Sequence, residues 1–268
     1  MRFRAIFGFL GFLLVLFVAL PVLRMVWEAG GGQMLEVTKA PEVRSAIFLT
    51  LRASLWATLL ALFFGVPLAY FLARVDFKGK KVIESLIDLP VVIPHTAAGI
   101  ALLLVWGRHS LLTRATGLTV VGTEVGITLA MLFVSLPFLV NGAKEGFRLV
   151  DVRLENTART LGASPFQAFW TVALPLAKKS ILSGSIMMWA RGISEFGAVV
   201  ILAYHPMTAS VLIFERFQNF GLQEATPVAA LLLIVSLVVI IVLRLIVCLL
   251  YTSPSPRDLS TSRMPSSA

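Results

Sequence analysis

The sequence predicts an all-α polytopic membrane protein with six transmembrane helices per subunit and a helix pair on its cytoplasmic side. Of the 268 residues, 58% are apolar and 14% are charged, whereas about 25% of a soluble domain is charged. The apolar residues also gather in runs of roughly 20, the length that a membrane-spanning helix needs. These runs lack the two-residue alternation of barrel strands, so helices must satisfy their backbone groups.

The predicted crossings follow one another along the chain. The fifth run contains Arg191 and Glu195 as its charged residues, and the other runs contain none. The first run follows Met-Arg-Phe-Arg, which is also typical of a signal peptide. It is longer than a cleavable apolar core and no small-x-small site follows it, so we interpret it as a retained helix. The six predicted helices span residues 5–23, 53–73, 89–107, 125–143, 180–204 and 225–243.

The chain divides into three parts. Residues 1–46 hold the first helix and an external loop, and residues 47–247 hold the other five predicted crossings. From Thr252 the sequence turns to Ser, Thr and Pro without periodicity, which cannot build a core. Because this stretch resembles translated cloning sequence, we expect residues 248–268 to be a non-native or disordered tail.

The positive charges predict the orientation. The N-terminus, the loops after the second and fourth helices, and the C-terminus together carry most of the 23 lysines and arginines. Lys and Arg accumulate on the cytoplasmic side of a membrane, so both termini are predicted to be cytoplasmic in a multi-pass protein of the cell membrane. The net charge of +9 is then a topology signal and does not indicate nucleic-acid binding.

The loop between the fourth and fifth helices, residues 151–175, carries strong local signals. Asp151 is a suitable N-cap for a helix over residues 152–161, on which Leu154, Ala158 and Leu161 share one face. Gly162 fits the left-handed residue that ends such a helix. Ala163 then leads into a second helix.

The second helix of this loop has its own start signals. Ser164 is the expected N-cap, Pro165 occupies the first helical position, and Gln167 completes a capping box. Leu174 and Pro175 predict a break before the next crossing. A compact helix–glycine–helix unit of this kind suits a groove in a soluble partner, although a simple membrane-surface connection would show the same signals.

The residue spacing adds a resemblance. Gly162, Val172, Leu174 and Pro175 match the coupling-loop signature of binding-protein-dependent ABC importer permeases: Glu-Ala-Ala, three residues, Gly, nine residues, Ile, one residue, Leu-Pro. Asn156 and Thr157 depart from the usual Glu and first Ala, and Glu155 lies one place earlier. The resemblance implies that the loop couples to an ATPase through Glu155, Asn156, Ala158, Leu161, Gly162, Ala163, Ser164, Pro165, Leu174 and Pro175.

Two further segments, residues 88–104 and 189–207, resemble the molybdate/tungstate permeases, whose close relatives are the sulfate/thiosulfate permeases. The resemblance implies that residues 47–247 are an ABC importer type-1 transmembrane domain with the coupling loop at residues 151–175. It also implies a homodimer, two cytoplasmic ATPase subunits and an external binding protein that delivers a tetrahedral oxyanion. ATP and Mg would bind to the ATPase subunits, so no cofactor or metal is expected in this chain. The residues themselves do not separate molybdate, tungstate and sulfate.

Three polar residues within predicted crossings are candidates for function. Arg191 is expected roughly 16 Å into the fifth helix, near the midplane, and Glu195 one turn further on the same face. Such residues are costly in a membrane and often functional. They either form a structural ion pair or bias a path toward anions. His95 is expected roughly 9 Å into the third helix, as a packing residue or a gating residue.

Other classes of function find less support. An intramembrane enzyme needs paired carboxylates, a Ser–His pair or a metal motif at membrane depth. At that depth the sequence has one arginine, one glutamate and one histidine, Arg191, Glu195 and His95, which form none of these sets. A passive channel or secondary transporter needs no capped cytoplasmic helix pair, and no inverted repeat relates the two halves. The sequence therefore favours a permease energised by a separate subunit.

Overall fold

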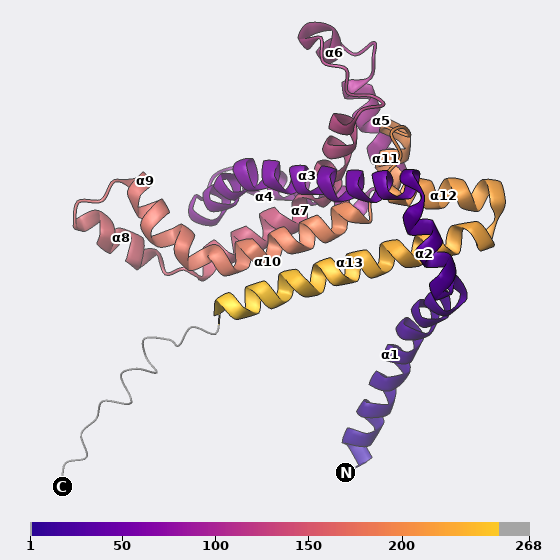
Figure 1. Cartoon of the computed structure of the whole chain (residues 1–268). Coiled ribbons are helices and arrows are strands. Elements are labelled where there is room, and N and C mark those ends of the chain that lie inside the picture. The colour runs from indigo at the N-terminus through magenta and orange to yellow at the C-terminus, as the bar shows by residue number, and fades with distance from the viewer. Residues whose placement is uncertain (1, 252–268) are drawn as a thin grey trace.

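The computed structural model describes residues 2–251, and within this range every regular element is helical (Figure 1). The all-α prediction is therefore confirmed. In chain order the elements are α1 (Arg2–Ala29), α2 (Gly31–Lys39), α3 (Pro41–Arg74), α4 (Lys80–Val92), α5 (His95–Trp106), α6 (Leu111–Thr116), α7 (Glu124–Leu149), α8 (Val152–Thr160), α9 (Pro165–Ala168), the π-helical turn η1 (Phe169–Ala173), α10 (Leu174–Ile193), α11 (Gly197–Leu202), α12 (Ala209–Phe220) and α13 (Leu222–Tyr251).

The core lies where α7 packs between α3 and α10. Small buried residues recur along α3 at Ala53, Ala57 and Ala61, which is the spacing of one helix face. On the other side, a Cβ added to Gly142 of α7 would lie 3.0 Å from the Cα of Gly184 on α10. Small residues let apolar helices approach closely in a membrane, so close packing holds this bundle together.

The number of crossings differs from the prediction. Four described helices are long and apolar enough to span a membrane, and α4 with α5 makes a fifth if that bent pair counts as one span. The predicted crossing over residues 180–204 is not confirmed, because α10, which covers its first part, contains Lys178, Lys179 and Arg191 and is less apolar than the four spans. The four spans are Ile6–Ala29, Pro41–Arg74, Glu124–Leu149 and Leu222–Leu245.

Two predicted crossings are broken helices, so the prediction of single helices over 89–107 and 180–204 was wrong. The first breaks at Ile93 and Pro94, where α4 and α5 meet at a bend of 117°; a proline lacks the N–H and disfavours helix in the residue before it. The second breaks after Ile193, and α11 begins at Gly197. Each break frees backbone N–H and C=O groups from the helix, and other groups of the protein must form hydrogen bonds with them.

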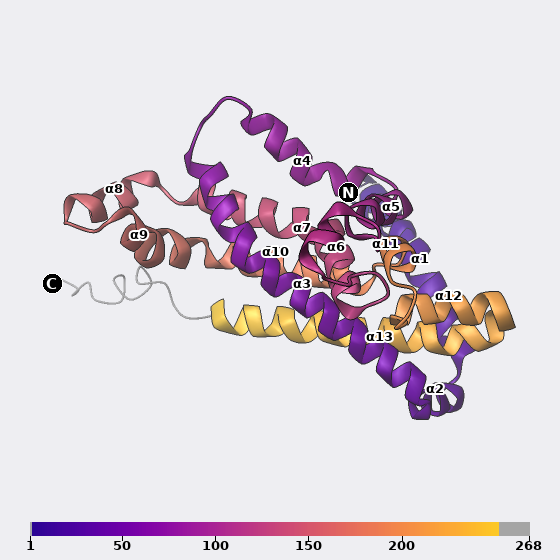
Figure 2. The same cartoon turned by 90° about the horizontal axis from the view of Figure 1, so that it is seen from above.

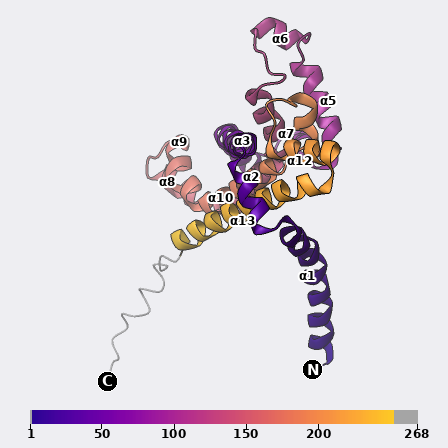
Figure 3. The same cartoon turned by 45° about the vertical axis from the view of Figure 1, so that its right-hand side comes forward.

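The two ends of the bundle carry different elements. Figures 1 and 2 both place α8 and α9 at one end, called here the coupling end, and α2 and α12 at the other. Figure 3 shows α1 and the segment from α5 to α6 projecting away from the bundle. The expected boundary between residues 46 and 47 falls inside α3. Of the expected tail, residues 248–251 belong to α13, and residues 252–268 lie outside the described residues.

Candidate functional site

The loop over residues 151–175, called here the coupling loop, has the predicted caps in its first half. The Asp151 carboxylate accepts a hydrogen bond of 2.9 Å from the backbone N–H of Arg153 at the start of α8. The helix ends at Thr160, one residue earlier than predicted. Gly162 has a φ of 99°, the left-handed conformation that favours glycine, and the Ala163 N–H returns 3.0 Å to the Ala158 carbonyl. This bond closes α8 as a Schellman-type cap does.

The second half begins with the predicted capping box. The backbone N–H of Gln167 donates to Ser164 Oγ at 3.2 Å, and the Ser164 N–H donates to Gln167 Oε1 at 2.7 Å. Pro165 occupies the first turn of α9. The two helices and the glycine between them therefore form a defined unit, because each cap is made by residues within five positions of one another.

The predicted break at Leu174 and Pro175 is absent. Helical structure continues from α9 through η1 into α10, and Pro175 lies in the first turn of α10. A proline within a continuous helix lacks the N–H that would bond to the preceding turn. The π-helical turn changes the hydrogen-bond register immediately before it. The coupling loop is thus directly continuous with the helix that follows.

The outer surface of the coupling loop exposes four large apolar side chains among polar ones. Leu161 is 84% exposed, and Leu154, Phe166 and Trp170 are also exposed. Asn156, Gly162, Ser164, Pro165 and Pro175 are exposed as well, whereas Ala158, Ala163 and Leu174 are half-buried. Apolar side chains grouped at the end of a bundle mark an interaction surface.

Glu155 behaves differently from the rest of the predicted coupling residues. It is 5% exposed and turns toward α3, where Tyr70 and Arg74 donate hydrogen bonds to its carboxylate. Asn156, at the place of the usual glutamate, remains exposed. Of these two neighbouring residues, Asn156 is therefore the one whose polar side chain is available to a partner.

The three polar residues predicted within the membrane come together in one cluster. Arg191 Nη2 lies 2.9 Å from Glu195 Oε2 and 2.8 Å from His95 Nε2. An arginine can only donate, so the imidazole accepts; His95 Nδ1 lies 3.3 Å from the same Arg191 Nη2 and 3.5 Å from Glu195 Oε2. The Glu195 side chain is 1% exposed, while His95 and Arg191 are half-buried. The charge of Arg191 is thus balanced within the cluster.

This cluster joins both helix breaks. His95 is the first residue of α5, not a residue roughly 9 Å inside a straight helix as predicted. Glu195 lies beyond the end of α10, and its Oε1 accepts the backbone N–H of Ala198 at 2.9 Å, which caps α11. A Cβ on Gly197 would lie 2.7 Å from His95 Cβ. The starts of α5 and α11 are therefore held against each other and against the end of α10.

Local sequence signals did not reveal that His95 belongs with Arg191. The two residues are 96 positions apart, and the prediction placed them on separate helices. A signal was present in the two interruptions themselves, Pro94 in one apolar run and the Arg191–Glu195 pair in the other. Broken helices in membranes gather polar groups because freed backbone must be satisfied.

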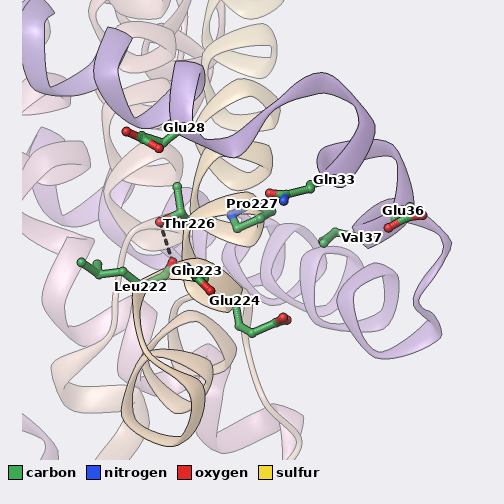
Figure 4. A pocket seen from close by; sticks show the side chains of 9 residues that line it. All are labelled: Glu28, Gln33, Glu36, Val37, Leu222, Gln223, Glu224, Thr226 and Pro227. Atoms are coloured by element: carbon green, nitrogen blue, oxygen red, sulfur yellow. Dashed lines mark hydrogen bonds between the residues drawn. The ribbon is translucent and has the colours of Figure 1, made fainter.

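A cavity of about 690 Å³ lies at the end of the bundle opposite the coupling end, where α1, α2 and α13 meet. Figure 4 shows Glu28, Glu36 and Glu224 around it, one from each helix, with Gln33 and Gln223 among the other lining residues. Glu28 is paired with Arg24, and the carboxylates of Glu36 and Glu224 disfavour an anion by charge repulsion. This cavity is therefore unsuited to holding a dianionic oxyanion.

Comparison with known proteins identifies the family. The family model described as "Binding-protein-dependent transport system inner membrane component" matches residues 65–252. The chain belongs to this family of transport permeases. It is therefore a membrane transport subunit, in agreement with the coupling-loop resemblance, and the alternatives of an intramembrane enzyme and a passive channel do not agree with the family.

Individual relatives agree with this assignment. The chain is 44% identical to the molybdate/tungstate transport system permease protein WtpB of Pyrococcus abyssi, over 89% of this chain and 93% of that protein. It is 37% identical to a probable sulfate transport system permease protein of Chlorokybus atmophyticus, over 75% and 73%. The crystal structure of a bacterial ABC transporter that imports alginate matches the fold of this permease with a TM-score of 0.72 at 16% identity, covering 94% of this chain and 97% of that one.

Proposed function

We propose that this chain is the permease subunit of an importer that moves molybdate or tungstate across the cell membrane. Two copies would form the path, two ATPase subunits would dock at the coupling loops, and an external binding protein would deliver the oxyanion. The observation that carries the proposal is the capped helix–glycine–helix unit, which presents Leu161 and Phe166 to solvent at one end of the bundle. ATP and Mg would be bound by the ATPase.

The choice of substrate rests on similarity. The molybdate/tungstate permease of Pyrococcus abyssi is 44% identical to this chain over the aligned residues, against 37% for the sulfate relative. Tetrahedral oxyanions of equal charge differ little in shape, and a conducting path must bind its cargo weakly. Recognition therefore belongs to the binding protein. Sulfate or thiosulfate is the competing substrate class.

The role of the polar cluster follows from its charge balance. Glu195 neutralises Arg191 at 2.9 Å, and His95 takes a further donor of the same guanidinium. An arginine whose charge is already paired attracts a passing anion weakly. We therefore favour a structural clamp over an anion-selective site for Arg191, and the clamp fixes the breaks between α4 and α5 and between α10 and α11.

One labelling experiment tests the orientation on which the proposal depends. The single cysteine, Cys248, is replaced by serine, and Leu161→Cys places a thiol on the exposed side of the coupling loop. A membrane-impermeant maleimide should label this thiol only after cells are permeabilised. A matched thiol at Leu222, which is exposed at the opposite end of the bundle, should react in intact cells. Labelling of residue 161 in intact cells would refute the proposed ATPase docking site.

Transport itself is tested with the binding protein present. Uptake of radiolabelled molybdate into proteoliposomes that contain the permease, its ATPase and the binding protein should require ATP. Excess unlabelled tungstate should compete strongly and sulfate weakly. Stronger competition by sulfate than by tungstate would move the assignment to the sulfate class while leaving the permease assignment intact.

A further inference from the structure

The coupling end contains a buried polar cluster formed by Tyr70, Arg74 and Glu155. Arg74 Nε and Nη2 donate to Glu155 Oε1 at 2.8 Å and 2.5 Å, and the Tyr70 hydroxyl donates to Glu155 Oε2 at 2.6 Å. The Arg74 side chain is 11% exposed. Both carboxylate oxygens are therefore satisfied by the last turns of α3.

The cluster also reaches the end of α7. Arg74 Nη2 donates a further hydrogen bond of 3.0 Å to the carbonyl of Val150, the residue that caps α7. The Tyr70 ring packs edge-on against Phe147 of α7 and Phe169 of η1, with ring centroids 5.2 Å and 4.8 Å apart. One tyrosine and one arginine thus join four elements: α3, α7, α8 and η1.

Stability alone is a weak reason for such an arrangement. Replacing a buried ion pair by apolar residues of similar volume is often neutral or stabilising, and buried pairs serve best to fix a specific geometry. Here the geometry concerned is the placement of α8, which otherwise packs on α9 and η1 within the coupling loop. Among the described residues, Glu155 makes the side-chain hydrogen bonds that attach α8 to α3.

We propose that Tyr70 and Arg74 are positioning residues for coupling, which hold α8 on α3 through Glu155. Movement of the coupling loop would then be delivered to α3 as well as to α10. This inference rests on the proposed function, because it assumes an ATPase docked at the loop. It separates two roles within the loop: exposed residues bind the motor subunit, and Glu155 transmits its movement.

The test uses the complete transporter in proteoliposomes, with molybdate as the probe and with uptake and ATP hydrolysis measured together. Glu155→Gln and Arg74→Gln should leave the ATPase bound and hydrolysing while uptake per ATP falls by at least about 5-fold, the low end of typical coupling between sites. The reversed pair, Arg74→Glu with Glu155→Arg, should recover part of the loss.

Two further variants distinguish a loss of coupling from a general loss of folding. Tyr70→Phe removes one donor and keeps the ring packing, so it should fold normally and lower uptake per ATP in the same direction. Asp76→Asn is the matched control: Asp76 is exposed two residues beyond Arg74, where the hydrogen bond and charge of Lys80 lower the pKa of its carboxyl. Its neutralisation should leave uptake per ATP unchanged.

Two results would overturn the inference. Unchanged uptake per ATP in both Glu155→Gln and Tyr70→Phe would show that the cluster transmits nothing. Loss of ATPase binding in Glu155→Gln, with uptake and hydrolysis falling in parallel, would assign Glu155 to docking instead. Failure of the unaltered permease to bind any ATPase is a separate result, and it would count against the proposed function itself.

Discussion

The Gly162→Val substitution is the sharpest probe of the coupling loop. Gly162 has a φ of 99°, and a Cβ added there would meet no atom within 4 Å. The cost of the substitution is therefore backbone strain without a clash. The left-handed conformation costs an L-residue about 1–2 kcal/mol, and a branched residue is a particular outlier there. A shift of that size changes the population of the native loop by a factor of about 5–30.

The expected result is a fall of the same size, about 5–30-fold, in the ATPase recovered when the tagged permease is purified from membranes. Gly117→Val is the matched control, because Gly117 ends α6 in the left-handed conformation with a φ of 68°, also in open space, away from the coupling loop. It should carry similar strain without affecting ATPase recovery. Full recovery with Gly162→Val, or equal losses in both variants, would refute the assignment of this loop as the docking element.

Three other substitutions test the caps, the clamp and the bundle. Ser164→Ala removes the α9 cap and should cost about 1 kcal/mol, measured as a several-fold weaker ATPase recovery that Ser164→Asp restores. Arg191→Ala leaves the buried Glu195 without its cation and should destabilise by about 3–5 kcal/mol, measured as a lower Tm in detergent; an unchanged Tm with lost uptake would favour a path role. Gly146→Leu, where even a Cβ would lie 2.5 Å from a neighbouring side chain, should destabilise by about 1–3 kcal/mol, whereas Gly8→Leu in open space should not.

Features set by neighbouring residues could be predicted from the sequence. Asp151, Gly162 and the Ser164–Gln167 box behave as predicted, because a cap is made by groups within five positions of one another. The long apolar runs also lie in helices, since their length and composition leave no other solution in a membrane. The missed end of the loop shows the limit of such signals: Pro175 indicated a break, but a π-helical turn absorbs it.

Features set by distant residues could not be predicted in the same way. Glu155 contacts Arg74 across 81 positions, and His95 contacts Arg191 across 96, distances at which periodicity carries no information. The family spacing even concealed the role of Glu155, because it placed the expected polar contact one residue later. Proline marked the break at residue 94, but the direction of the 117° bend depends on packing between α5 and α11.

The two candidate sites lie at opposite ends of one helical body. From Pro165 to Ile193 the chain is helical through α9, η1 and α10, a length of roughly 40 Å. The π-helical turn η1 is the point within this helical stretch where the hydrogen-bond register changes. Movement of the coupling loop is therefore either absorbed at η1 or transmitted to the end of α10 at Ile193. At the far end Arg191 carries its own counter-charge in Glu195 at 2.9 Å. The cluster can therefore shift with α10 as a unit, without exposing an unpaired charge to lipid.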